Sequence, residues 1–210
     1  MQDYSQPKKT VTGPAAECRI VCLTGFMGSG KSTVGRTLAA QLAWHFVDLD
    51  SEIERHTGMP ISQIFEQKGE PVFRDIEHER LTRVLGWASE RDARVVLALG
   101  GGTFAQARNA ALIHNPDSPR SAGVAVVWLD CAIDMLLQRC VLMGDRPLFR
   151  DEASFRRLYA ERLPYYRQAD YRIESAGESI RVVEQILALR IFGRSARLPV
   201  DGTAPGHPLL

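Results

Sequence analysis

The residues best suited to chemistry form a glycine-rich stretch, GFMGSGKST, at residues 25–33. It follows the apolar run Ile20–Leu23 and precedes a helical pattern from Val34 to Ala43. Glycines let the backbone curl until successive N–H groups surround phosphate oxygens, and the positive end of the next helix points to the same place. The spacing G-x-x-x-x-G-K-S, between a strand and a helix, therefore predicts a P-loop that binds a nucleoside triphosphate.

Two residues of this loop have side chains that suit nucleotide chemistry. Lys31 would reach the outer phosphates, and the Ser32 hydroxyl is placed to bind Mg²⁺. A glycine-rich turn without a ligand is the alternative, but such a turn has no need of the complete pattern. We therefore expect one Mg²⁺ ion and a nucleoside triphosphate at this loop.

An acidic pair follows on the next predicted strand, His45–Asp50. Alternation along a strand would place Asp48 and Asp50 on the same side, at the carboxyl end where open α/β sheets bind ligands. We interpret one carboxylate as a magnesium ligand and the other as the partner of a substrate hydroxyl. In the alternative interpretation, Asp50 only caps the helix that opens at Ser51.

Arginines and further glycines extend the possible site. Arg74 and Glu77 lie three apart on a predicted helix, so they can pair, although a surface salt bridge is the simpler interpretation. The triple glycine Gly100–Gly102 follows the apolar strand Arg94–Leu99 and would let the backbone approach a ligand closely. Residues 139–150 carry three arginines with Gly144 and Pro147, which suits either a lid over the site or an exposed basic loop.

The elements that must position these residues alternate between strand and helix five times along the chain. This order predicts an α/β three-layer sandwich with a five-stranded parallel sheet and right-handed crossovers. The helical segments are predicted at 34–43, 51–68 with a turn at 57–60, 72–90, 104–113, 132–140, 155–163 with a break at Pro164, and 179–191.

The composition fits one domain with a substantial core, which we place at residues 17–192 with a lid at about 141–156 and loose tails at 1–16 and 193–210. The 210 residues carry a net charge of +1, so no strong field suggests nucleic acid or a membrane surface as partner. The four cysteines lack metal-ligand spacing. No signal peptide or membrane-spanning run appears, so we expect a cytoplasmic protein. We also expect a monomer.

Taken together, the motifs resemble shikimate kinase, a member of the nucleoside monophosphate kinase-like P-loop enzymes. The resemblance extends from about Arg19 to Leu189. It depends on the motifs GFMGSGKST, DLD at 48–50, GEPVFRDIE at 69–77, LGGGT at 99–103, DRPLF at 145–149 and ERLPYYRQAD at 161–170. Two departures are a longer loop at 114–122 and the lack of a proline near 175–177, beside the expected adenine position.

The resemblance implies ATP-dependent phosphorylation of the 3-hydroxyl of shikimate and assigns the site residues. Asp50 would accept the hydroxyl proton, Asp48 would support Mg²⁺ through water together with Ser32, and Glu77 would orient Arg74. Shikimate would be bound by Asp50, Arg74, Gly100, Gly101, Gly102 and Arg162. ATP would be bound by Gly28, Ser29, Gly30, Lys31, Ser32, Thr33, Arg139 and Arg146, of which Lys31 and Arg146 would also assist the transfer.

Two rival functions stay open at the level of sequence. A gluconate kinase of the same fold would share the P-loop and lid, but would not be expected to combine the FR, GGG and ERLPYYR motifs. A nucleotide-dependent switch is the other rival. The guanine-reading N-K-x-D pattern is absent from the sequence, because none of its four lysines follows an asparagine.

Overall fold

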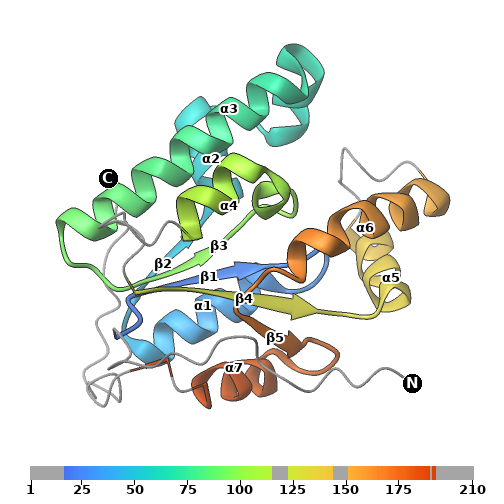
Figure 1. Ribbon diagram of the computed structural model, residues 1–210. Helices are drawn as coiled ribbons and strands as arrows, with labels where there is room; N and C mark the ends of the chain where they lie inside the picture. Colours follow the sequence, from blue (N-terminus) through green and yellow to red (C-terminus); the bar gives the residue numbers. More distant parts are fainter. Residues whose placement is uncertain (1–16, 115–122, 144–150, 190, 193–210) are drawn as a thin grey trace.

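The chain folds around one parallel β-sheet (Figure 1). The computed structural model describes residues 17–114, 123–143, 151–189 and 191–192. Within these ranges the strands are β1 (Ile20–Thr24), β2 (His45–Asp48), β3 (Val95–Ala98), β4 (Val124–Asp130) and β5 (Tyr171–Glu174). Their order is β2-β3-β1-β4-β5, and each neighbouring pair is parallel. The predicted five-stranded parallel sheet is confirmed.

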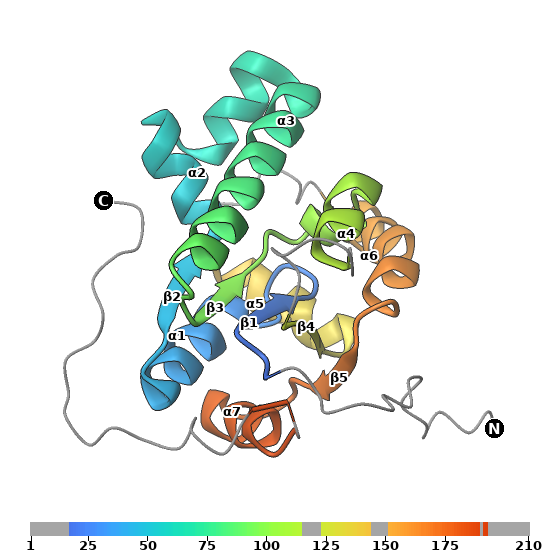
Figure 2. The ribbon, with the colours of Figure 1, turned by 60° about the vertical axis from the view of Figure 1, so that its left-hand side comes forward.

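Helices cover both faces of the sheet and its carboxyl end. The helical elements are α1 (Lys31–Leu42), α2 (Leu49–Thr57), α3 (Ile61–Glu90), the 3₁₀ helix η1 (Thr103–Ala105), α4 (Ala107–His114), α5 (Ile133–Met143), α6 (Glu152–Tyr166) and α7 (Ser179–Leu187). Helices α1 and α7 lie on one face, and α3 and α4 lie on the other (Figures 1 and 2). Helices α5 and α6 lie beyond the carboxyl ends of the strands (Figure 1). The three-layer sandwich is therefore confirmed.

The central strand β1 shows why its sequence is apolar throughout. Val21 and Leu23 pack into the core beneath α1 and α7, whereas Ile20 and Cys22 pack into the core beneath α3. All four side chains are at most 4% exposed. Because both faces of a parallel sheet are covered by helices, a central strand cannot alternate between apolar and polar residues.

The strand expected to carry both aspartates ends earlier than predicted. Strand β2 stops at Asp48, and Asp50 lies in the first turn of α2. The Asp48 carboxylate accepts hydrogen bonds from the backbone N–H groups of Asp50 and Ser51, which makes it the N-cap of that helix. The prediction that Asp48 and Asp50 share one side of a strand is therefore wrong. So is the alternative in which Asp50 is the cap.

Several helix boundaries differ from the prediction, at Gly30, at Phe104 and at Pro164. Helix α1 begins at Lys31 rather than Val34, because the left-handed Gly30 is already its N-cap. The helix predicted from Phe104 is divided between η1 and α4. The predicted break at Pro164 is wrong, since α6 continues to Tyr166. The ring of Pro164 removes only one hydrogen bond there, and the Arg167 N–H closes the last turn on the Leu163 carbonyl at 3.2 Å.

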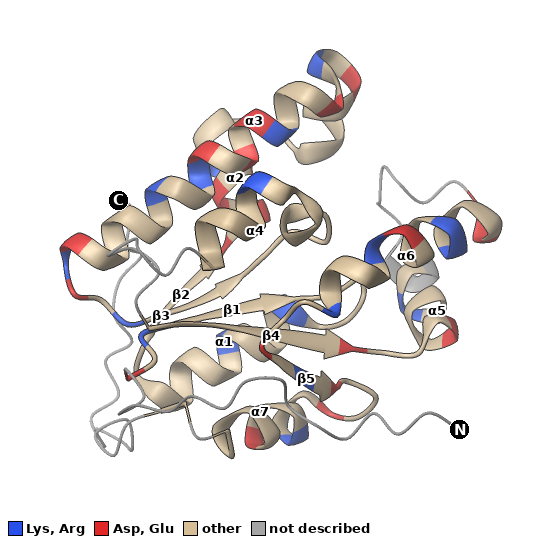
Figure 3. Ribbon diagram, viewed as in Figure 1, with Lys and Arg blue, Asp and Glu red and all other residues tan. Residues whose placement is uncertain are grey.

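The domain prediction can be compared with the described ranges only in part. The two predicted tails and the middle of the predicted lid, residues 144–150, lie outside those ranges. The helices and strands of the described ranges fall between residues 17 and 192, and none of these helices is long and apolar enough to span a membrane. Acidic and basic residues are interspersed along α3 and α6 (Figure 3), as the net charge of +1 would suggest.

Candidate active site

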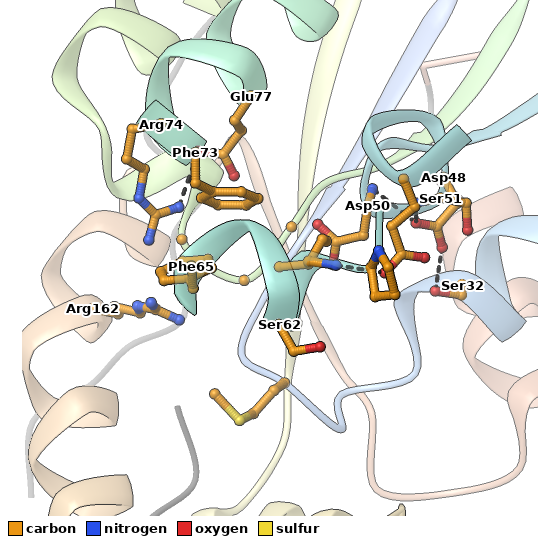
Figure 4. Close-up of a pocket in the computed structure, with 17 residues that line it drawn as sticks. Ser32, Asp48, Asp50, Ser51, Ser62, Phe65, Phe73, Arg74, Glu77 and Arg162 are labelled. Carbon is orange, nitrogen blue, oxygen red and sulfur yellow. Dashed lines mark hydrogen bonds and ion pairs between the residues drawn. The ribbon is translucent and has the colours of Figure 1, made fainter. Parts of the chain in front are cut away.

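A cavity of about 470 Å³ opens where β2 and β3 end (Figure 4). Nine of the predicted site residues line it, although they come from five separate stretches of the chain: Ser32, Asp48, Asp50, Arg74, Glu77, Gly100, Gly101, Gly102 and Arg162. The sheet brings them together because the carboxyl ends of parallel strands meet at one edge. The cavity thus lies where this fold class binds ligands.

The P-loop forms one border of the cavity. Gly25, Gly28 and Gly30 have φ angles of 142°, 80° and 89°, a range that favours glycine. The Lys31 ammonium donates hydrogen bonds to the carbonyls of Gly25 and Phe26, at 2.9 and 3.0 Å. The loop therefore has the conformation of an anion-binding turn that leads into a helix N-terminus, with the lysine folded over it.

The magnesium prediction concerns Ser32 and Asp48. The Ser32 hydroxyl donates a 2.5 Å hydrogen bond to Asp48 Oδ2, while Asp48 Oδ1 caps α2. A hydroxyl and a carboxylate oxygen thus lie side by side next to the P-loop, and hard oxygen ligands of this kind suit Mg²⁺. The described residues contain no cluster of three protein ligands, but Mg²⁺ in kinases commonly takes its other ligands from phosphate and water. These residues fit the ion.

Arg74 is held in a fixed direction by two carboxylates. Its Nη1 donates to Glu77 Oε2 at 3.0 Å, and its Nε and Nη2 donate to Glu70 Oε1 at 3.1 and 2.8 Å. Burial alone would lower the pKa of the guanidinium, but Glu77 and Glu70 outweigh it and raise that pKa above its usual value. Arg74 is only 8% exposed, so the surface-salt-bridge interpretation is wrong.

Arg162 approaches the same place from α6 (Figure 4). It is 7% exposed, and its guanidinium lies over the ring of Phe26 at 5.7 Å from the centroid. One turn later, the Tyr166 hydroxyl donates a short hydrogen bond to the Gly101 carbonyl. Burial raises the pKa of Tyr166 far above its usual value, so this donor stays protonated. Two buried cations therefore meet beside the glycine turn.

A Cβ at any of the three glycines Gly100–Gly102 would come close to a charged side chain. A Cβ on Gly100 would lie 2.6 Å from Asp50 Oδ1, and one on Gly101 would lie 3.3 Å from Arg162 Nη1. A Cβ on Gly102 would lie 2.8 Å from both terminal nitrogens of Arg74. The sequence predicted a close approach of the backbone to a ligand. The structure adds that the charged side chains of the site themselves occupy the space of the missing Cβ atoms.

The other described residues predicted for the nucleotide site do not line the cavity. Arg139 donates to the Gly28 carbonyl at 3.2 Å and to the Ser175 carbonyl at 3.5 Å. It thus joins the P-loop to the segment where adenine was expected. Ser29 is buried and Thr33 is exposed at the start of α1. Arg146 lies outside the described residues.

Some contributors were not identified from sequence. Phe65 and Phe73 line the cavity with their rings 4.6 Å apart, and Tyr166 fixes the Gly101 carbonyl. Phe73 and Tyr166 do lie inside the quoted motifs GEPVFRDIE and ERLPYYRQAD. Thr103 lies in LGGGT but has no charge or unusual spacing that would mark it.

A parallel sheet with a P-loop after its central strand, an acidic pair beside it and two arginines across a cavity defines a P-loop kinase that acts on a small acceptor. The family model for shikimate kinase matches residues 27–190. The shikimate kinase of Persephonella marina is 38% identical over 171 residues, which cover 80% of this chain and 97% of the relative. That of Gloeobacter violaceus is 43% identical over 169 residues, covering 79% and 88%.

A solved structure agrees with this result. Shikimate kinase from Acinetobacter baumannii in complex with shikimate superimposes with a TM-score of 0.68 at 37% identity, covering 82% of this chain and 92% of that one. The chain belongs to the shikimate kinase family. It is therefore an ATP-dependent kinase whose acceptor is an alcohol group.

The glycine turn yields a direct test. Gly102 has φ −106° and ψ −7°, so alanine can adopt its backbone conformation and Gly102→Ala adds only a Cβ. That atom would lie 2.8 Å from Arg74 and 3.1 Å from Arg162 Nη2, so both arginines would have to shift. We therefore expect shikimate to bind about 10- to 100-fold more weakly by calorimetry, the result of about 1–3 kcal/mol of overpacking.

Gly177→Ala is the matched control, because no heavy atom lies within 4 Å of its added Cβ. Unchanged shikimate affinity in Gly102→Ala would mean that the arginines do not need their observed positions.

Proposed function

We infer that this protein transfers the γ-phosphoryl group of ATP to the 3-hydroxyl of shikimate, giving shikimate 3-phosphate and ADP on the route to chorismate and the aromatic amino acids. The observation that supports this most strongly is the placement of Arg74 and Arg162 on one side of the glycine turn with Asp50 against the same turn. A small acceptor with a carboxylate at one end and hydroxyls at the other matches that arrangement.

The acceptor carboxylate would bind between the two arginines. Both are nearly buried, where charge-assisted hydrogen bonds are strongest. Glu77 and Glu70 already neutralise part of the charge of Arg74, which keeps the site stable before the substrate enters. The backbone of Gly100, Gly101 and Gly102 would border the ring of the substrate.

The transfer would take place at the other end of the cavity. Asp50 would accept the proton of the attacking hydroxyl as the new P–O bond forms, and the bond to the β-phosphate would break to release ADP. Lys31 and Arg146 would stabilise the charge of the transferring group. Lys31 would have to leave its P-loop carbonyls to do so, since phosphate oxygens would replace them as acceptors.

One magnesium ion would be held by Ser32 directly and by Asp48 through water, beside the P-loop. Bound there, Mg²⁺ supplies positive charge that neutralises the phosphate oxygens. Asp48 caps α2 through its Oδ1 oxygen, and its Oδ2 oxygen accepts from Ser32. Asp48 could therefore cap the helix and support the metal ion at the same time. Gly28 to Thr33 would cradle the phosphates, and Arg139 would lie near adenine.

A coupled assay of ADP release separates this function from its rivals. With saturating ATP and Mg²⁺, we expect rapid ADP release with shikimate, and only background release with gluconate or with no acceptor. Activity on gluconate alone would assign the chain to the other kinase. Equal ADP release with and without either acceptor would favour a nucleotide-dependent switch.

The base role of Asp50 predicts a separation between binding and turnover. Asp50→Asn keeps the shape of the side chain but removes its basicity, so kcat should fall about 10²- to 10⁴-fold. Binding of ATP, measured by calorimetry, should change little.

Asp75→Asn is the control, because Asp75 is an exposed carboxylate on α3 that pairs with Arg108 outside the cavity. Full turnover in Asp50→Asn would exclude Asp50 as the base.

We also infer that the protein acts as a monomer in the cytoplasm, without nucleic acid or a membrane as partner. The support is the near-neutral charge of the sequence and the nine predicted site residues that a single chain brings to the cavity.

A further inference from the structure

The Glu77 carboxylate that orients Arg74 needs two partners of its own. It is fully buried, and an unpaired charged oxygen in such a place is costly. Its Oε2 oxygen accepts from Arg74 (Figure 4). Its Oε1 oxygen accepts a 2.6 Å hydrogen bond from the Thr103 hydroxyl, and Thr103 is also fully buried. Thr103 thus determines the rotation of the carboxylate that determines the direction of Arg74.

Thr103 is itself fixed by a second buried group. Its backbone N–H donates to the Gly100 carbonyl at 3.1 Å, which closes the glycine turn. Its own carbonyl accepts from Asn109 Nδ2 at 3.1 Å, and Asn109 is 0% exposed. Because a backbone carbonyl only accepts, the amide nitrogen of Asn109 must face Thr103 and its Oδ1 oxygen must face His78.

These contacts form a closed ring that joins α3, the glycine turn and α4. Asn109 Oδ1 lies 2.7 Å from His78 Nδ1, so that ring nitrogen must carry the hydrogen. His78 follows Glu77 directly on α3, so the hydrogen bonds run from α3 to the turn, to α4 and back to α3. A ring of this kind allows little independent movement of the turn and the helix that carries Arg74.

The same hydroxyl lies close to the other end of the cavity. A Cβ on Gly100 would be 2.9 Å from Thr103 Oγ1, 3.2 Å from Glu77 Oε1 and 2.6 Å from Asp50 Oδ1. Thr103 and Glu77, which orient Arg74, and Asp50, the proposed base, therefore all lie close to the backbone of Gly100. A shift of Thr103 would alter the distance between the carboxylate-binding end and the reacting end.

We propose that Thr103 is a positioning residue for the acceptor: through Glu77 its hydroxyl holds Arg74 in the direction that binds the substrate carboxylate, with Asn109 and His78 bracing Thr103 from behind. This inference rests on the proposed function, since it needs shikimate as the acceptor. Without the hydroxyl, Glu77 Oε1 would lose its donor, and the carboxylate would rotate toward Arg74 to recover one.

Three variants test this by steady-state kinetics. Thr103→Val keeps the size of the side chain and removes the hydroxyl, whereas Thr103→Ser keeps the hydroxyl. Thr82→Val is the matched control, because within the described residues the Thr82 hydroxyl on α3 bonds to the His78 carbonyl of its own helix and to no other group. We expect Thr103→Val to raise KM for shikimate about 10-fold, the equivalent of one lost buried hydrogen bond, with KM for ATP unchanged. Thr103→Ser and Thr82→Val should both remain close to the unmodified enzyme.

Several outcomes would overturn the proposal. They are an unchanged KM for shikimate in Thr103→Val, an equal rise in KM for both substrates, or a loss in Thr103→Ser as large as in Thr103→Val. If Thr103→Val does not fold, Thr103→Ala compared with Thr103→Ser isolates the hydroxyl in the same way. An unmodified enzyme without shikimate-dependent ADP release would contradict the proposed function as well, whereas an active enzyme with an unaffected Thr103→Val contradicts this inference alone.

Discussion

The site depends on the burial of two arginine side chains beside a turn that has no side chains of its own. Arg74 and Arg162 are 8% and 7% exposed, and desolvating a cation is costly unless fixed partners compensate. Glu77 and Glu70 compensate Arg74, and the Phe26 ring lies beneath Arg162. Glycine at 100–102 leaves space for these groups, because a Cβ at any of the three positions would lie 3.3 Å or less from a charged side chain. An anion entering the cavity would complete the pairing, which is why we propose that the two arginines bind a carboxylate.

The sheet joins this acceptor region to the P-loop. The P-loop follows strand β1, and the glycine turn follows the neighbouring strand β3. Because these two strands are parallel, both loops lie at the same edge of the sheet. On the far side of β3, strand β2 ends at Asp48, which both caps α2 and meets Ser32. Asp50 follows in the first turn of α2 and reaches the glycine turn. A donor and an acceptor bound at these places would meet at the carboxyl edge of three neighbouring strands.

Local patterns in the sequence were enough for the sheet and its parallel pairing, because buried strands and the P-loop have strong periodic or spacing signals. The roles proposed for the arginines came instead from the resemblance to shikimate kinase. Local patterns were not enough where a side-chain hydrogen bond ends an element or joins distant parts of the chain. The carboxylate of Asp48 ends β2 by capping α2, and strand alternation cannot reveal that. The bond from Thr103 to Glu77 spans 26 residues and that from Tyr166 to Gly101 spans 65, so neither follows from local spacing. Both require the tertiary fold.

The carboxylate-binding role of the arginine pair is the central claim, and a substrate analogue tests it most directly. The methyl ester of shikimate retains the three hydroxyls and the ring but lacks the negative charge. With saturating ATP, kcat/KM for the ester should be at least about 100-fold lower than for shikimate, because two buried guanidinium groups would lose their anionic partner. Equal kcat/KM for the acid and the ester would contradict the claim, since the arginines would then contribute nothing to recognition of the acceptor.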